Sequence, residues 1–377
     1  MSSPFHPRPP LTYLLSSPLL SLLYPIHSLL LHLRGPPQPS PNGARPIRVV
    51  CISDTHTQRW EDVPDGDLLI HAGDLSNDGS LREIQAAVDW LKSLPHRHKV
   101  VVCGNHDSFF DRRSRRSEDR EQDEDKTLGE VSMSSSTMTA SIRSLEDYDY
   151  ERDLNRIDWG DIHYLQHSSV TLSFPSSPSP TGTTRSRSLT IYGAPQIPAL
   201  VPFGPEHAFT YPPHHDAWSS TVPVETDILV THTPPAYHCD LSPVFSAGCP
   251  FLLSEVWRVR PALHVFGHVH AGYGKEPVFW DEAQRAWERL CESRRVWLPA
   301  QNRRTGGVMM LVTGLLRDMV DVRAWVDAAR VVVYGILGVA WARVWGGENR
   351  GCGWMVNAAC MYRNSGRLGN KPVVVEL

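Results

Sequence analysis

The sequence predicts an α/β fold, and three segments near its start carry that prediction. Residues 47–53 (IRVVCIS), 67–73 (DLLIHAG) and 99–104 (KVVVCG) are short, continuous apolar runs of the kind that forms buried strands. Between the second and the third, residues 80–94 place apolar side chains at helical spacing, and Ser80 is the expected N-cap. This strand–helix–strand order is typical of a βαβ unit with a largely buried sheet.

Strand-like runs resume later in the chain, and a helical insertion is expected among them. Residues 276–352 have the character of that insertion, which precedes the last strand. Its uncharged run 331–342 is 12 residues long, too short to span a membrane, and predicts a buried helix or a partner surface. The later strand-like runs are 188–194 (SLTIYGA), 226–232 (TDILVTH), 262–268 (ALHVFGH) and 371–377 (KPVVVEL).

Composition places the chain among ordinary globular proteins. Of its 377 residues, 41% are hydrophobic and 21% are charged, and the net charge of −4 gives no basic field that would attract nucleic acid. We therefore expect no sequence-specific nucleic-acid partner. The seven cysteines are scattered singly without a CxxC pair, which favours reduced thiols in an intracellular, cytoplasmic protein.

Three segments lack the pattern of a packed element. Residues 1–45 form a Pro/Ser/Leu-rich tail with ten prolines and no acidic residue. Its leucine-rich part, 11–33, is interrupted by prolines, serines and histidines, so the tail is expected to be disordered or processed, or to be a targeting or anchor segment that contacts a membrane. Residues 111–147 are densely charged and then serine-rich, which predicts disorder. Residues 173–188 predict a loop rich in Ser, Pro and Thr.

Polar side chains follow five of the predicted strands, each at the point where the strand ends. Sites in α/β sheets form at the carboxyl ends of strands, so these groups are expected to converge. The residues are Asp54 and His56, Asp74, Asn105 with His106 and Asp107, His232, and His268 with His270.

The chemistry of this set indicates divalent transition metals. Carboxylates, an amide oxygen and imidazoles suit Mn, Fe or Zn, and the lack of a thiolate argues against a structural zinc site. The donors exceed the needs of one ion, and two ions about 3.5–4 Å apart need a bridging ligand such as a carboxylate. His268 and His270, at i and i+2 of an extended chain, would point the same way and each reach one ion.

In this order, the motifs DTH, GD, GNHD, a lone His and GHVH resemble those of the calcineurin-like metallophosphoesterase superfamily. The stretches ISDTH, THTPP and FGHVHAGYG are similar to its small metallophosphoesterase-domain-containing branch, which is linked to cyclic-nucleotide phosphodiesterases. The resemblance implies a four-layer α/β/β/α sandwich of two mixed sheets, formed by residues 46–275 and 353–377.

The resemblance also implies a role for each polar residue. Asp74 would bridge the two metals, His106 would protonate the leaving oxygen or stabilise the transition state, and Asp107 would orient His106. The remaining positions would be metal ligands: Asp54, His56 and His270 for the first ion, and Asn105, His232 and His268 for the second.

The expected activity is that of a dinuclear-metal phosphoesterase. Two divalent ions (Mn, Fe or Zn) would allow a bridging hydroxide to attack phosphorus in line, in a phosphodiester or a phosphomonoester. The substrate would be a phosphate-ester small molecule or a nucleotide. The alternative is a non-catalytic metal-binding scaffold of the same fold that acts through protein contacts, but His106 is retained. Residues that could reach the substrate are His207, His214 and His215, and those that could line the pocket are His238, Asp240 and Tyr273.

Overall fold

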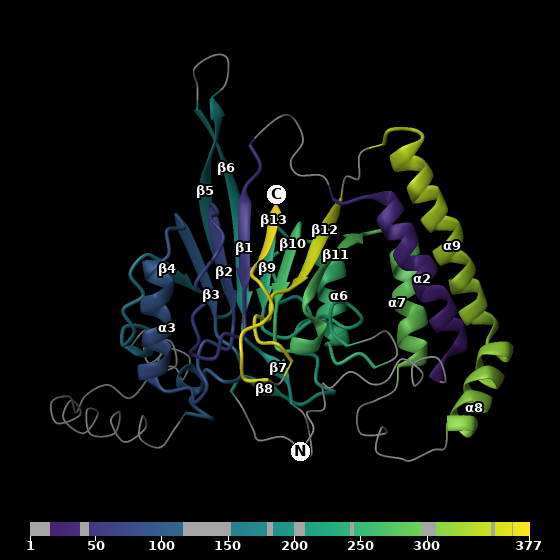
Figure 1. Ribbon diagram of the computed structural model, residues 1–377, viewed down its shortest axis with the longest axis horizontal. Coiled ribbons are helices and arrows are strands. Elements are labelled where there is room, and N and C mark those ends of the chain that lie inside the picture. Colours follow the sequence, from purple (N-terminus) through teal and green to yellow (C-terminus); the bar gives the residue numbers. More distant parts are fainter. Residues whose placement is uncertain are drawn as a thin grey trace, which may run out of the picture.

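Two large mixed β-sheets lie face to face in the computed structural model, with a further group of helices along one flank (Figure 1). The structure describes residues 16–37, 45–115, 152–178, 184–199, 208–241, 245–295, 307–347, 351–363 and 365–377.

The first sheet contains the predicted βαβ unit and has the strand order β13-β1-β2-β3-β4. Strands β1 to β4 run parallel, and β13 pairs antiparallel with β1. Helix α3 (Leu81–Ser93) connects β2 to β3, and its predicted N-cap is confirmed because Ser80 Oγ accepts the Glu83 N–H at 3.3 Å. The strands are β1 (Arg48–Ile52), β2 (Leu68–Ala72), β3 (His98–Val102), β4 (Ile162–Tyr164) and β13 (Val373–Glu376).

The second sheet has the strand order β11-β12-β10-β9-β6-β5, with four parallel inner strands and an antiparallel strand at each edge. Helix α6 (Pro250–Val259) connects β9 to β10, and a small parallel pair, β7 (Ile197–Pro198) and β8 (Thr210–Tyr211), lies apart. The strands are β5 (Ser168–Pro178), β6 (Thr184–Ala194), β9 (Ile228–Thr231), β10 (Leu263–Phe266), β11 (Gly274–Phe279) and β12 (Cys352–Asn357).

Alternation of side chains along the strands builds the layers. Val49 and Cys51 of β1 belong to the core between the two sheets, whereas Val50 and Ile52 belong to the core under α3. A third core joins Val256 of α6 to the outer face of the second sheet. The order helix, sheet, sheet, helix confirms the predicted four-layer α/β/β/α sandwich.

Four helices form an additional layer beside the second sheet, which we call the flank group (Figure 1). Its core includes Leu20, Trp287 and Val331 and also takes in Tyr237 from the loop after β9. By length and apolar composition alone, α9 is the one described helix that could cross a membrane, and 22% of its most apolar stretch is buried in the fold. The helices are α2 (Pro18–Arg34), α7 (Glu282–Arg294), α8 (Gly307–Val320) and α9 (Val322–Arg343).

The expectation of a disordered tail is wrong for residues 18–34, which form α2. Pro18 stands in the first turn, where a missing N–H costs nothing, and Ser17 caps the helix. The inward side of α2 buries leucines against the flank group, and His27 stacks on Trp287 with ring centroids 4.3 Å apart. Tertiary packing thus overrides the proline content of this segment. Residues 1–15 and 38–44 of the predicted tail lie outside the described part.

The predicted loop 173–188 is instead part of the β5–β6 hairpin, of which 179–183 lie outside the described residues. Leu172 and Phe174 point into the core between the sheets, while Ser173 between them is exposed. The Ser173 and Ser188 hydroxyls hydrogen-bond across the strands at 3.3 Å. The serines therefore occupy the solvent face of a period-2 strand pattern, which their abundance concealed.

Two further insertion boundaries differ from the prediction. Residues 111–115 are packed into the fold, since Arg115 is buried and pairs with Asp153 at 2.5 Å. Residues 116–147 of that charged insertion lie outside the described part. Residues 276–279 of the predicted helical insertion belong to β11, and Cys352 begins β12. The helices within that span begin at Glu282 and end at Arg343.

Candidate metal centre

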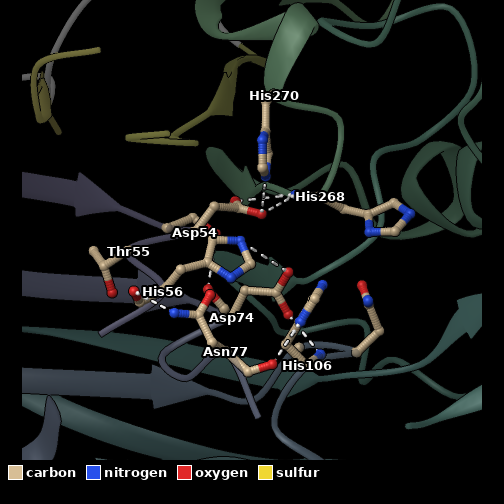
Figure 2. A network of polar contacts seen from close by, with 12 residues as sticks. Asp54, Thr55, His56, Asp74, Asn77, His106, His268 and His270 are labelled. Atoms are coloured by element: carbon tan, nitrogen blue, oxygen red, sulfur yellow. Dashed lines mark hydrogen bonds and ion pairs between the residues drawn. The ribbon is translucent and has the colours of Figure 1, made fainter. Parts of the chain in front are cut away.

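Side chains from the five polar strand ends lie close together at the carboxyl ends of the strands, and Figure 2 shows most of them. Asp54 follows β1, Asp74 follows β2, Asn105 follows β3, and His232 and His268 follow β9 and β10. The loops are joined by main-chain hydrogen bonds as well, for example from the Asp54 N–H to the Gly73 carbonyl at 2.9 Å. The structure therefore brings together residues that lie up to more than two hundred positions apart in the sequence.

Several of these residues hold a left-handed backbone conformation. The φ angles of Asp54, His56, Asp74 and His268 are 52°, 44°, 54° and 64°. This conformation costs on the order of 1 kcal/mol for a residue with a side chain, and it persists only where the surroundings impose it. Each sharp turn directs the chain out of its strand and places a polar side chain at the strand end. Such strain is typical of functional sites.

Two glycines leave room for the carboxylates. A Cβ on Gly104 would lie 2.3 Å from Asp74 Oδ1, and one on Gly267 would lie 2.1 Å from Asp54 Oδ2. Both distances are far inside van der Waals contact. The glycines of the GNHD and GHVH motifs are therefore needed because the acid side chains occupy the space beside them.

The first cluster of donors consists of Asp54, His56 and His270, whose ligand atoms lie within 4.8 Å of one another. His270 Nε2 is 3.1 Å from Asp54 Oδ1. The Asp54 carboxylate also accepts the His268 main-chain N–H at 3.1 Å. These are the three residues predicted for the first ion, and the fold places them around one space.

Asp74 lies between this cluster and a second one. Its Oδ2 is 3.6 Å from His56 Nε2, and its Oδ1 is 3.4 Å from His232 Nε2. Asn105 Oδ1 lies 3.0 Å from the same His232 nitrogen. One carboxylate thus faces imidazoles of both clusters, which is the position that a bridging ligand requires.

Main-chain carbonyls orient two of the imidazoles. The Ala72 carbonyl lies 2.9 Å from His232 Nδ1, and the Arg363 carbonyl lies 2.6 Å from His270 Nδ1. Because a carbonyl only accepts, Nδ1 carries the hydrogen in both rings and Nε2 faces the site. This is the usual support of a metal-binding histidine.

Asp107 does not take the position predicted for it. Its buried carboxylate accepts main-chain N–H groups of Gly104 at 2.8 Å and Ser76 at 2.9 Å, and the Ser76 hydroxyl at 2.7 Å. It therefore ties the loop after β3 to the loop after β2. The ring of His106 is held instead by the Asn77 carbonyl, 3.0 Å from Nδ1 (Figure 2). The sequence interpretation missed Asn77 because its contribution is a main-chain oxygen.

His268 lies on the side of the site expected for it, but the chain that carries it is not extended as predicted. Strand β10 ends at Phe266, and residues 270–272 form a 3-10 turn, so the alternation expected of an extended chain does not apply. In Figure 2 the His268 ring is directed away from Asp54. It packs against the ring of His232, with centroids 5.1 Å apart, and so lies on the side of the second cluster.

Histidines balance the charge of the buried carboxylates. Burial by itself raises the pKa of Asp54 and of Asp74, but the imidazoles of His270 and His232 outweigh it and hold the pKa of both carboxyls below the usual range. Burial lowers the pKa of His232, and the charges of Asp74 and Asp54 reverse this and raise it to about 9. Divalent cations would replace the protons in this role, so metal binding is expected to release them.

The donors fit a pair of divalent ions. Three overlapping groups, each with its ligand atoms within 4.8 Å, occur among the described residues of the site. All donors are carboxylate, amide or imidazole groups, and glycines keep the space beside the carboxylates clear. The groups are Asp54–His56–His270, His56–Asp74–His106 and Asp54–Asp74–His232. The structure thus places His106, predicted as a catalytic residue, within ligand distance as well.

Of the predicted pocket-lining residues, His215 borders an open groove of about 580 Å³ together with Asp111 and Gln196. His207 lies outside the described residues. Two others have structural roles instead. His238 is buried between Glu276 and Glu288. The Asp240 carboxylate accepts N–H and O–H groups of its own loop.

Asn357 is a residue that the sequence interpretation did not assign to the site. It is fully buried at the end of β12, and its Nδ2 donates to the carbonyls of Cys239 at 2.8 Å and Val269 at 2.9 Å. Val269 lies between His268 and His270. Asn357 thus fixes the turn that carries both histidines. In the sequence, Asn357 lies in the stretch MVNAA (residues 355–359), which is similar to the small metallophosphoesterase-domain-containing branch of the family but does not by itself assign the amide to the site.

Comparisons with known proteins identify a family for this chain. A family model described as calcineurin-like phosphoesterase matches residues 47–272. The flank group therefore lies outside the matched stretch. Among solved structures, TT1561 of Thermus thermophilus is 14% identical, with a TM-score of 0.35, covering 62% of this chain and 85% of that one.

Three curated relatives are similar over about two thirds of this chain. Metallophosphoesterase domain-containing protein 1 of Homo sapiens is 33% identical, over 63% of this chain and 65% of that protein. UPF0046 protein K07C11.7 of Caenorhabditis elegans is 34% identical, over 63% and 68%. Probable rhamnogalacturonate lyase C of Emericella nidulans is 36% identical, over 67% of this chain and 20% of that protein. The chain thus spans between a fifth and about two thirds of these relatives.

Proposed function

Because the chain belongs to the calcineurin-like phosphoesterase family, we propose that it hydrolyses a phosphodiester bond at a dinuclear metal centre. The observation that carries the proposal is the position of Asp74, whose carboxylate oxygens face His56 on one side and His232 on the other at 3.6 and 3.4 Å. A single buried carboxylate between two clusters of imidazoles suits a pair of ions better than one ion.

The proposed metal ligands form two sets. Asp54, His56 and His270 would hold one ion. Asn105, His232 and His268 would hold the other, and Asp74 would serve both. When bound, two divalent ions supply Lewis acidity that neutralises phosphate charge and lowers the pKa of water. The buried carbonyl and carboxylate contacts around the histidines keep these ligands in place before substrate arrives.

His106 is the proposed proton donor to the leaving oxygen. Its Nδ1 lies against the Asn77 carbonyl, so Nε2 is the atom that we assign to the transfer. Its main-chain N–H donates to Asp74 Oδ1 at 2.9 Å, which places the residue beside the bridging position. A general acid in this position contributes roughly 10²–10⁴-fold to the rate.

A diester is proposed as the substrate, with a monoester as the alternative within the same chemistry. The preference rests on the resemblance of the motifs to the branch that is linked to cyclic-nucleotide phosphodiesterases. The lyase activity named for the Emericella nidulans relative is not proposed for this chain, because the match covers a fifth of that protein.

The test compares hydrolysis of bis-p-nitrophenyl phosphate and p-nitrophenyl phosphate with and without Mn²⁺. Asp74→Asn is expected to lower turnover at least about 10³-fold, because charge stabilisation by a metal is worth several kcal/mol and 1.36 kcal/mol is tenfold. Asp65→Asn, at an exposed carboxylate far from the strand ends that carry the ligands, is the matched control and should turn over normally.

The ratio of the two substrates separates a diesterase from a monoesterase. If the wild-type chain binds two metals but hydrolyses neither compound, the proposal of catalysis fails and the scaffold alternative is favoured.

A further inference from the structure

The flank group exposes almost all of the large apolar side chains that the described residues leave in water. All of them except Val224 and Tyr362 come from α2, α8, α9 and the two residues that follow α9. We call this surface, made of the outward side chains of those three helices together with Val344 and Trp345, the flank face. A soluble domain rarely exposes an apolar patch that spans several helices. This face is therefore expected to bind another apolar surface.

Helix α9 shows how little of the flank group is turned inward. Its buried residues are spaced four, three and four positions apart and form one narrow stripe: Ala324, Ala328, Val331 and Gly335. Outside that stripe, Val333, Ile336 and Leu337 are each more than half exposed. A surface helix normally carries polar residues there. In α9 the buried stripe consists mostly of small residues, and large apolar side chains stand where polar ones are usual.

The charges on the flank face have one sign. Within the described parts of α2, α8 and α9, the exposed charged residues are Arg323, Arg330 and Arg343. Arg330 is partly neutralised by Asp327, whose carboxylate lies 3.2 Å from its Nη1. The acidic residues turn inward: Asp318 pairs with Arg294 and Asp327 with Arg289, each at 2.8 Å. The whole chain carries a net charge of −4, so this cationic face is a local feature.

Exposed aromatic side chains are the third feature of the flank face, after its apolar surface and its arginines. Trp325, Trp341 and Trp345 are between 51% and 67% exposed, and Tyr24 and Tyr334 are about half exposed. Tryptophan and tyrosine concentrate where hydrocarbon meets lipid headgroups, because one part of the ring is apolar and the other forms hydrogen bonds. We propose that the flank face binds the surface of a lipid bilayer that contains anionic headgroups.

The helices are proposed to lie in the membrane interface rather than to cross it. The uncharged run Val331–Ala342 has 12 residues. At 1.5 Å per residue it spans about 18 Å, well short of the roughly 30 Å hydrocarbon core. Asp327 and Arg330 lie just before it, and the ion pair of Asp327 with Arg289 fastens α9 to α7. An apolar surface with arginines around it is typical of interfacial helices.

A second copy of the chain fits the flank face less well than lipid does. A two-fold dimer pairs a patch with itself. The exposed charges in the described part of this face are all arginines, so such a dimer would bring like charges together without an exposed acidic residue to receive them. Anionic headgroups supply the missing opposite charge.

Binding of the flank face to a bilayer would leave the metal centre accessible to solvent. The flank helices run along the side of the sandwich (Figure 1), whereas the ligand loops follow the carboxyl ends of the strands. The inference does not depend on the proposed hydrolysis, since it concerns different residues.

The test uses co-sedimentation of the full chain with vesicles of phosphatidylcholine alone or mixed with phosphatidylserine. We expect binding to the mixed vesicles that falls at least tenfold on removal of phosphatidylserine or at high salt. The double variant Ile336→Glu/Leu337→Glu should lose binding at least tenfold. Val224→Glu, at an apolar residue 64% exposed outside the flank face, is the matched control and should bind as the wild type does.

Four outcomes would overturn the proposal. They are a wild-type chain that binds neither vesicle, a double variant that binds undiminished, a chain that dimerises in ultracentrifugation without binding lipid, and a chain that resists carbonate extraction as a spanning protein does. Thermal unfolding of each variant, measured alongside, shows whether a loss of binding reflects a loss of fold. If the double variant is unfolded, Arg323→Gln/Arg343→Gln replaces it and must weaken binding to phosphatidylserine vesicles.

Discussion

The metal centre and the flank face both reverse the usual distribution of residues. Asp54 and His232 at the centre are completely buried, whereas Met319 and Val320 on the flank face are 71% and 76% exposed. Buried charges and broad exposed apolar surfaces are each uncommon, because the first loses hydration and the second orders water without compensation.

The buried charges of the metal centre and the exposed apolar side chains of the flank face differ in whether other residues of the chain offset their cost. The buried carboxylates accept main-chain N–H groups and face imidazoles, so most of their cost is offset inside the chain. The exposed side chains of the flank face have no such compensation within the described residues. Buried charges that are compensated within the chain indicate a small ligand held by the fold. Exposed apolar side chains without such compensation indicate a partner outside it.

A polar connection joins the two regions. His238 lies between Glu276 of β11 and Glu288 of α7, with ring nitrogens 2.6 and 3.0 Å from the carboxylates. The next residue, Cys239, receives a hydrogen bond from Asn357, which also holds the turn between His268 and His270. The flank group and the metal centre thus share one loop.

The largest expected effect separates metal binding from chemistry. His106→Asn should lower kcat by about 10²–10⁴-fold, because the proposed proton donor is lost. The metal content, measured by atomic emission, should remain at two ions per chain. A variant that loses one ion would assign His106 to the ligands, which its place near His56 and Asp74 would also allow.

The second largest effect is expected at His238, which connects the metal centre to the flank group. His238→Leu leaves the buried Glu288 without its cationic partner and should destabilise the fold by about 3 kcal/mol, measured by urea unfolding. His163→Gln, at a half-buried position, is the control and should change little.

This variant also predicts a pH dependence. Burial lowers the pKa of His238, but Glu276 and Glu288 reverse this and raise it to about 10. Because the folded pKa exceeds the unfolded value of about 6.5, the stabilisation is fully present below pH 6.5 and lost as the pH rises toward 10. The difference in unfolding free energy between wild type and His238→Leu should narrow over that interval. A constant difference would contradict the assignment of charge to His238.

A smaller effect is expected from Asn357, which holds the turn from His268 to His270 (the histidine turn). Asn357→Ala should weaken Mn²⁺ binding about 10–100-fold, as removal of residues that support metal ligands does. Asn370→Ala removes an amide with the same chemistry, since Asn370 Nδ2 donates to two carbonyls at 3.0 and 3.1 Å. Equal losses in both variants, measured by calorimetric titration, would reduce the role of Asn357 to general stability.

The smallest effect distinguishes the two sides of α9. Ala328 lies in the buried stripe and Ala329 beside it is exposed. Ala328→Leu should destabilise the fold by at least about 1 kcal/mol through overpacking. Ala329→Leu should leave stability unchanged and strengthen vesicle binding. The reverse order in thermal unfolding would mean that α9 is packed differently.

Strands and their polar ends could be predicted because both signals are local. The runs that became β1, β2, β3, β9 and β10 contain β-branched residues and are each followed within three positions by a polar residue of the site. The segments that were misjudged lack such a signal. The hairpin β5–β6 carries serines on its solvent face, and α2 contains Pro25 and depends on remote packing against Trp287.

The sequence by itself determined the types of ligand and their order along the chain, because each lies within a few residues of the strand that carries it. The tertiary structure alone decided how they are supported: which carbonyl orients each imidazole, that Asp107 ties two loops together, and that Asn357 holds the histidine turn. It also decided which sides of α2, α8 and α9 face outward. These features depend on contacts between residues far apart in the chain, and no local pattern records which partner a side chain will meet.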